Sequence, residues 1–116
     1  MKRAAMLLVG ALAVLLSSCA LANRMSGMDV VHDLQTRGLA AEAKILKIWD
    51  TGVRVNDDPV VGFLLEVYPP DGESYEAQTK GPISIVHMPR FQPGAVIPVR
   101  IDPQNPARVA LDIYRH

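Results

Sequence analysis

The chain has 116 residues, with 12 Lys and Arg, 12 Asp and Glu, and one cysteine. This length is that of a single domain, and a lone cysteine excludes an intrachain disulfide, so the chain is not a disulfide-stapled secreted domain. Two of the 12 basic residues, Lys2 and Arg3, lie in an N-terminal leader, which leaves 10 basic against 12 acidic side chains. Because these basic residues are scattered singly, we expect no nucleic-acid partner.

The first 18 residues have the pattern of a signal peptide. Lys2 and Arg3 precede 13 uncharged, mostly apolar residues, 4–16, and small residues follow at Ser17 and Ser18. Thirteen helical residues reach about 20 Å, against the roughly 30 Å of a bilayer's hydrocarbon core. We therefore predict a cleaved signal peptide over residues 1–18, cut between Ser18 and Cys19. The run of small and apolar residues continues to residue 22, so an uncleaved anchor is the alternative.

The segment Leu16-Ser17-Ser18-Cys19 resembles the lipobox of bacterial lipoproteins. The resemblance implies that the Cys19 thiol carries a diacylglyceryl group, that the bond before Cys19 is cut, and that the new amino terminus is acylated. Each buried methylene contributes about 0.8 kcal/mol, so two or three acyl chains hold a protein at a membrane. Ser18 stands where Gly or Ala is commoner, and a plain secretory signal is the other interpretation. Ala20 after the cysteine implies the outer membrane if the source is a diderm bacterium.

Residues 19–38 are predicted to form a lipidated tether and one short helix. The tether covers residues 20–25. Ser26-Gly27-Met28-Asp29 has the form of a capping box and Gly38 that of a helix C-cap. An apolar face recurs at Met28, Val31 and Leu34. We expect this face to dock on the domain body rather than to lie on a membrane.

Residues 39–116 are predicted to form a small β-domain. Extended segments with alternating apolar residues are residues 43–49, 60–68, 75–80, 96–101 and 108–113, and residues 83–88, between two prolines, are a weaker sixth candidate. Turns are expected at residues 50–52, 56–59, 69–72, 91–94 and 102–106. The fold class is therefore mainly β: a small antiparallel meander of five to six strands, curled into a barrel or sandwich.

Several turn residues of this domain also resemble a known family. They are Thr51-Gly52, Val55-Asn56, Pro59, Pro93-Gly94, Val99-Arg100-Ile101-Asp102-Pro103 and Pro106. They are similar to those of an uncharacterised family of small bacterial extracytoplasmic β-domains, found in membrane proteins. The resemblance covers residues 39–113, and Ile101 departs from the aromatic residue that the family often has there. It implies fold and setting only, because the family has no established activity.

The residues that could carry chemistry are few. His32, His87 and His116 are isolated, so no metal site is predicted. Asp50, Asp57 and Asp58 could ligate a cation, but residues 56–59 make a turn more simply. Ser84, like Ser74, lacks the G-x-S-x-G turn of a nucleophile. A triad of His87, Ser84 and an aspartate is not excluded by spacing, yet so small a domain has little room to bury a reaction. We expect no enzyme and no cofactor.

Three aromatic residues flank turns and form a candidate interaction patch: Trp49, Tyr68 and Phe91. The alternative is that they cap the barrel ends. The leading hypothesis is a lipid-anchored, non-enzymatic envelope protein that binds an envelope protein partner, one route being strand docking at the edge of an incomplete barrel. The rival is a binder of a small ligand or lipid held inside the barrel. The predicted interior residues are Val61, Phe63, Leu65, Ile97, Val99, Val109 and Leu111.

Overall fold

The computed structural model describes residues 21–114. The predicted signal peptide, the cleavage position at Ser18 and the lipidated Cys19 all lie outside the described residues, as does His116.

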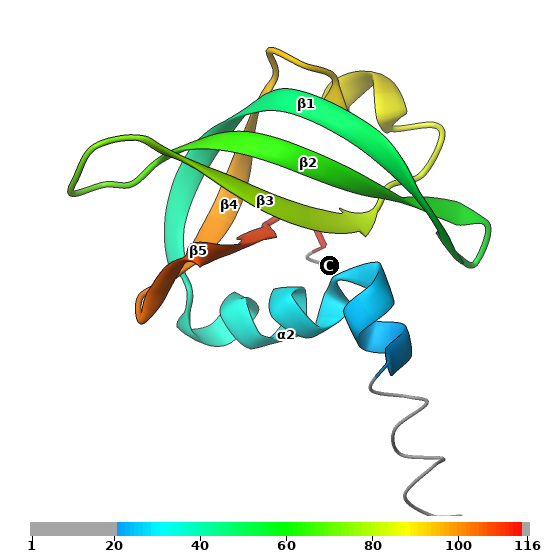
Figure 1. Cartoon of the computed structure of the whole chain (residues 1–116), viewed down its shortest axis with the longest axis horizontal. Helices are drawn as coiled ribbons and strands as arrows, with labels where there is room; N and C mark the ends of the chain where they lie inside the picture. Colours follow the sequence, from blue (N-terminus) through cyan, green and yellow to red (C-terminus); the bar gives the residue numbers. More distant parts are fainter. Residues whose placement is uncertain (1–20, 115–116) are drawn as a thin grey trace, which may run out of the picture.

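The described chain begins with helical structure (Figure 1). Residues 21–26 are helical, so the prediction of a tether over residues 20–25 is wrong from residue 21 onward. A second helix, α2, spans Met28–Arg37. The predicted capping box is also wrong. Ser26 ends the preceding helical segment, where its hydroxyl donates to the carbonyl of Asn23 at 3.0 Å, and Gly27, with φ of 81°, turns the chain into α2.

The end and the apolar face of α2 agree with the predictions. Gly38 is the C-cap, and its N–H donates to the carbonyl of Leu34 at 2.9 Å. Val31 and Leu34 are buried against Ala110, so the face docks on the sheet (Figure 1). The helix is thereby fixed to the body of the domain by apolar packing.

The first two strands are longer than their patterns indicate. Strand β1 spans Leu39–Val55 and β2 spans Asp58–Tyr68. The turn predicted at residues 50–52 is a bulge within β1, because Gly52 N donates to Asp50 Oδ1 at 2.8 Å and the register shifts there without reversing the chain. The reversal comes at Asn56 and Asp57, both with positive φ, as a two-residue hairpin with a type I′ turn requires.

Three further strands complete one antiparallel sheet of order β3-β2-β1-β4-β5. They are β3 (Tyr75–Pro82), β4 (Val96–Asp102) and β5 (Asn105–Leu111). The predicted five-stranded, mainly β fold is confirmed, and the first three strands form a meander. The chain then crosses to the other side of β1, where β4 pairs.

The sixth strand candidate, residues 83–88, is not a strand. A turn over residues 85–87 leads into a 3₁₀ helix, η1, spanning Met88–Phe91. Pro89 stands in the first turn of η1, where a missing N–H costs least. The two prolines that bracket this segment therefore favour a tight coil over a ladder.

The sheet curls until its two edge strands, β3 and β5, approach each other, but it does not close. No ladder joins these strands within residues 21–114. Side chains bridge the seam instead: Tyr75 Oη donates to Pro106 O at 2.7 Å and Thr79 Oγ1 donates to Val109 O at 2.6 Å.

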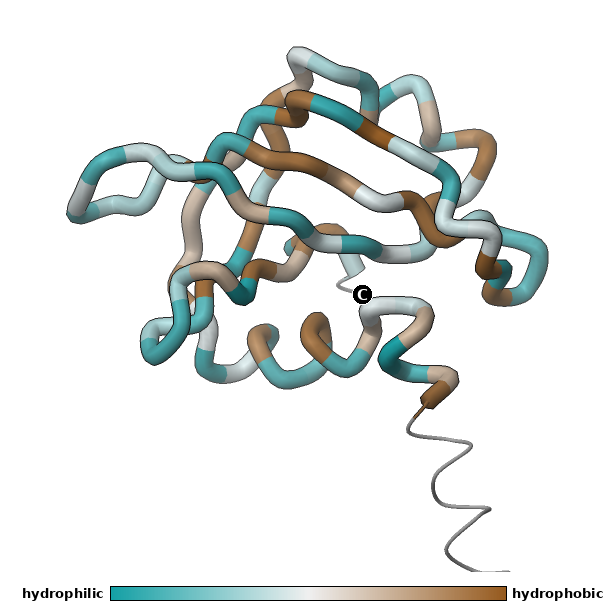
Figure 2. Tube along the Cα trace, viewed as in Figure 1, coloured by the Kyte–Doolittle hydropathy of each residue, from teal (hydrophilic) through white to brown (hydrophobic). Residues whose placement is uncertain are grey.

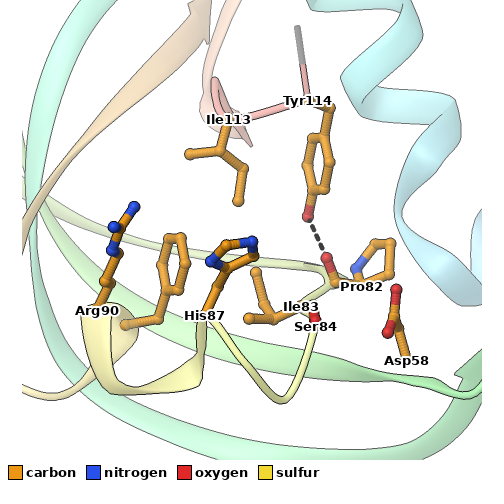
Figure 3. Close-up of a pocket in the computed structure, with 9 residues that line it drawn as sticks. Asp58, Pro82, Ile83, Ser84, His87, Arg90, Ile113 and Tyr114 are labelled. Carbon is orange, nitrogen blue, oxygen red and sulfur yellow. Dashed lines mark hydrogen bonds between the residues drawn. The ribbon is translucent and has the colours of Figure 1, made fainter. Parts of the chain in front are cut away.

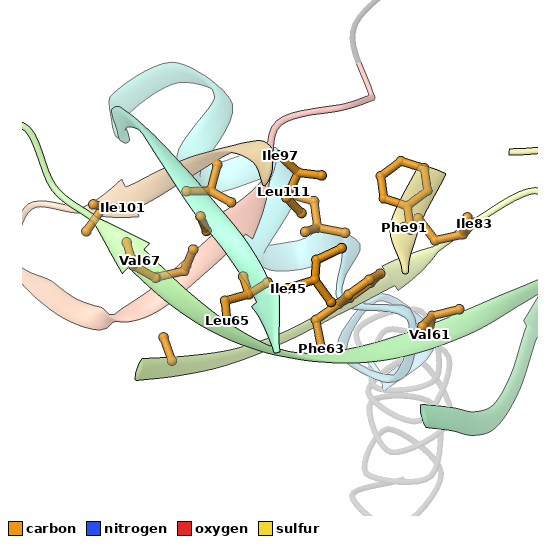
Figure 4. Packing of buried hydrophobic residues seen from close by; sticks show 14 residues of the cluster. Ile45, Val61, Phe63, Leu65, Val67, Ile83, Phe91, Ile97, Ile101 and Leu111 are labelled. Atoms are coloured by element: carbon orange, nitrogen blue, oxygen red, sulfur yellow. The ribbon is translucent and has the colours of Figure 1, made fainter. Parts of the chain in front are cut away.

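The concave side of the curl is filled by apolar side chains (Figure 4). All seven residues predicted to line the interior are buried there, joined chiefly by Ala43, Ile45, Val67, Ala77, Ile83, Phe91 and Ile101. Hydrophobic residues are frequent along β2, whereas the tip of the β1–β2 hairpin is hydrophilic (Figure 2). The interior is therefore a packed core.

Candidate functional site

One hollow among the described residues has a volume of about 450 Å³ and lies where β3 ends (Figure 3). Nine residues line it: Asp58, Pro82, Ile83, Ser84, His87, Arg90, Phe91, Ile113 and Tyr114. They come from the start of β2, the end of β3, the segment between β3 and β4, and the chain after β5. We call this feature the end hollow.

Backbone hydrogen bonds fix the wall between β3 and β4. Ile83 N donates to the carbonyl of Pro59 at 3.0 Å, so the chain stays against β2 after β3 ends. His87 N then donates to Ser84 O at 2.9 Å, and Arg90 N donates to His87 O at 3.0 Å. The result is a tight turn followed by η1, which holds the side chains of His87 and Arg90 on one short segment.

The floor of the end hollow is apolar. Ile83 and Phe91 are buried, and Phe91 packs edge-on against Phe63 with ring centroids 6.4 Å apart. Tyr114 crosses from the C-terminal segment and donates its hydroxyl to Pro82 O at 3.1 Å. Burial raises the pKa of Tyr114, so this hydroxyl stays protonated and remains a donor.

The rim of the end hollow carries opposite charges on opposite sides (Figure 3). His87 and Arg90 stand three residues apart at η1 and are exposed, while Asp58 stands across the hollow. In a 3₁₀ helix, residues three apart lie above one another on one face. This geometry gives the hollow a basic side and an acidic side.

The end hollow brings together the residues of the triad that spacing left open, but not in catalytic geometry. Ser84, His87 and Asp58 all line it. Within residues 21–114, no hydrogen bond joins the Ser84 hydroxyl to the His87 imidazole. A serine needs such a base to become a nucleophile, and this contact is not made in the described structure.

The predicted interaction patch does not form as one surface. Phe91 is only 8% exposed and belongs to the core, so its prediction as a surface residue is wrong. Its turn is a 3₁₀ helix whose last residue points inward. Trp49 is half-buried opposite Gly62, and Tyr68, 39% exposed, lies six residues farther along β2, or about 20 Å.

An exposed apolar pair next to the end hollow was not anticipated from the sequence. Ile85 is 69% exposed and Val86 is 81% exposed, in the turn after Ser84. Their apolar pattern predicted a strand, and a strand would have buried one of the two. As a turn, the segment presents both side chains to solvent beside the site.

A second cluster joins α2 to the β4–β5 hairpin through charges. Arg37 donates to Asp33 and to both carboxylate oxygens of Asp102, and Arg108 contacts the same two aspartates. The sequence offers one signal for this cluster, the i,i+4 spacing of Asp33 and Arg37. Asp102 is 65 residues from Arg37 and gives no local signal.

Residues 21–114 contain neither a metal-binding cluster nor a membrane-spanning helix. No group of three His, Cys, Asp or Glu side chains there could hold a metal ion. Within the same residues, no helix has both the length and the apolar character needed to cross a bilayer.

Comparison with known families gives one match. Residues 41–116 match the model of a family described as a domain of unknown function (DUF3592). Neither the curated proteins nor the solved structures give a match. The resemblance to an uncharacterised β-domain family over residues 39–113 agrees with this range. Since the match covers well over half of the 116 residues, the chain belongs to the DUF3592 family.

Proposed function

We propose that the chain is a lipid-anchored protein of the bacterial cell envelope whose β-domain is a non-enzymatic binding module. The observation that carries this proposal is the sequence Leu16-Ser17-Ser18-Cys19, with the chain's only cysteine after an apolar segment of signal-peptide length. The anchor would face the periplasm or the exterior, on the outer membrane in a diderm bacterium. Its partners would be the membrane, through the lipid, and an envelope protein.

The position of the first helical segment supports an anchoring role for Cys19. The first described residue, Leu21, is helical, and it follows Cys19 by two positions in the sequence. Two residues span at most about 7 Å, whatever their conformation. A lipid on Cys19 would therefore hold the folded body close to the bilayer surface, and the charged cluster at Arg37 and Asp102 would keep α2 fixed against the sheet.

Two features of the described fold favour binding at the end hollow. The concave interior is filled by the core, which leaves the rival hypothesis of a ligand inside the barrel without space. The seam between β3 and β5 is occupied by the hydrogen bonds of Tyr75 and Thr79, which opposes docking of a partner strand there. The end hollow combines an apolar floor with a few polar groups, as ligand sites do.

The anchor is tested by metabolic labelling with an alkyne fatty acid, followed by membrane fractionation of the cells. We expect wild-type protein to be labelled and to sediment with membranes, and Cys19→Ala to lose the label and retain its leader. Ser18→Ala, which places a commoner lipobox residue next to the cysteine, should be labelled like the wild type. Unlabelled wild-type protein in the cytoplasm would refute the anchor.

A further inference from the structure

We propose that the end hollow binds an amphipathic anion, an alkyl chain with a carboxylate or phosphate head group. The head group would contact Arg90 and His87, and the chain would lie on Ile83 and Ile113. This inference rests on the proposed role as a binding module and names the class of ligand that the module takes.

The size and floor of the end hollow suit a short alkyl chain. Its volume of about 450 Å³ lies within the range of small-molecule sites, about 300–1,000 Å³. Ile83 is almost fully buried beneath it, and Ile113 and the ring of Tyr114 are half-buried around it (Figure 3). An alkyl chain placed there would cover apolar surface that water now contacts, which favours binding.

The pairing and the position of Arg90 together mark the anion-binding end. Of the six arginines in residues 21–114, four have aspartate partners: Arg37, Arg54, Arg100 and Arg108. Arg24 and Arg90 have no ion pair within the described chain, and of these two only Arg90 lines the end hollow, next to His87. A guanidinium without a carboxylate partner, beside an apolar floor, matches a ligand that brings both an anion and an apolar chain.

Asp58 sets the orientation of the ligand. It lies across the hollow from Arg90 and would repel a head group placed at its own side (Figure 3). The anion must therefore sit at the η1 side. This orientation distinguishes the proposed site from non-specific hydrophobic binding. Removing the charge of Arg90 should weaken binding of the anion, and removing the charge of Asp58 should strengthen it.

The test uses the purified full chain in phosphatidylcholine nanodiscs, with ¹³C-labelled isoleucine methyl groups observed by NMR. The ligands are octanoate, octyl phosphate, octanol and octyltrimethylammonium. We expect octanoate and octyl phosphate to shift the methyl signals of Ile83 and Ile113. The core methyl signals of Ile45, Ile97 and Ile101 should stay unchanged and serve as internal references.

Matched variants locate the head group and the chain. Arg90→Gln should weaken octanoate binding about fivefold and leave octanol binding unchanged, as expected for an exposed ion pair. Arg54→Gln, on the β1–β2 hairpin, is the control and should change neither. Asp58→Asn should strengthen octanoate binding, and Ser84→Trp, which fills the hollow, should abolish binding of both ligands.

Three results would overturn the proposal. The first is that no methyl signal of Ile83 or Ile113 shifts with millimolar octanoate or octyl phosphate. The second is equal binding of octyltrimethylammonium, and the third is that only an acidic peptide shifts these signals. Failure of the lipid anchor is recognised separately, since loss of fatty-acid labelling at Cys19 leaves octanoate binding to the end hollow unaffected.

Discussion

Arg37 donates from Nη1 and Nη2 to the two carboxylate oxygens of Asp102, each at 2.9 Å, across 65 residues of sequence. The carboxylate is almost fully buried, with its side chain 5% exposed, and also accepts the N–H of Gln104 at 2.9 Å. Paired, planar contacts of this kind fix direction as well as distance. The pair therefore holds the end of α2 against the turn between β4 and β5.

The first prediction concerns acid stability. Hydrogen bonds from Arg37, followed by that from Gln104 N, lower the pKa of Asp102 from 3.8 to about 2. Since the pKa is lower in the folded state, the carboxylate stabilises the fold fully above pH 3.8 and loses this contribution as the pH falls toward 2. In that pH window we expect Asp102→Asn to take up about one proton fewer on unfolding than the wild type does. The number of protons follows from the pH dependence of the unfolding free energy, measured by urea denaturation at several pH values.

Arg37→Gln provides the cross-check for this prediction. Asp33 also has a lowered pKa, because Arg37 and then Arg108 donate to it. Removing Arg37 should therefore flatten the pH dependence of the unfolding free energy further than Asp102→Asn does. A wild-type pH dependence in both variants would show that the cluster does not stabilise the fold.

The second prediction distinguishes a core residue from a surface residue. Phe91 packs edge-on against Phe63 and is 8% exposed, so Phe91→Ala should lower the free energy of unfolding by about 3 kcal/mol. Tyr68→Ala, at an exposed site, should lower it by less than about 1 kcal/mol. Chemical denaturation of both variants measures these changes. If both substitutions lower the free energy of unfolding by the same small amount, Phe91 is a surface residue.

The parts of the fold that depend on local spacing were predictable. The buried face of α2 at Val31 and Leu34 follows a helical repeat, and Val61, Phe63 and Leu65 alternate along β2, so both were predicted correctly. Periodicity reports which side of an element is apolar, whatever it packs against.

The remainder depends on contacts that no local pattern encodes. Residues 83–88 are largely apolar, which favoured a strand. The prolines on either side restrict the backbone, however, and the segment forms a turn that exposes Ile85 and Val86. The end hollow forms because the chain after β5 returns to Pro82 through Tyr114, a contact 32 residues apart. Its basic side was missed because His87 and Arg90 become neighbours only in η1.

The third prediction concerns Gly62 and the chain's only tryptophan. A Cβ at Gly62 would overlap the indole ring of Trp49, which lies across from it on β1. We expect Gly62→Ala to lower the free energy of unfolding by about 1–3 kcal/mol and to shift the Trp49 emission to longer wavelength, as the ring is pushed into solvent. In a Trp49→Leu background, Gly62→Ala should lower the free energy of unfolding by less. An equal loss of unfolding free energy in both backgrounds would show that contact with Trp49 is not the cause.

The fourth prediction tests how the open seam of the sheet is held. Thr79 Oγ1 donates to Val109 O at 2.6 Å, joining β3 to β5 where no ladder does, and both residues face the interior. Thr79→Val keeps the shape and removes the donor, so the free energy of unfolding should fall by about 1 kcal/mol and amide exchange in β5 should quicken. Thr79→Ser retains the hydroxyl and should preserve the slow exchange. If amide exchange in β5 is as slow in Thr79→Val as in the wild type, apolar packing alone keeps the edge strands together.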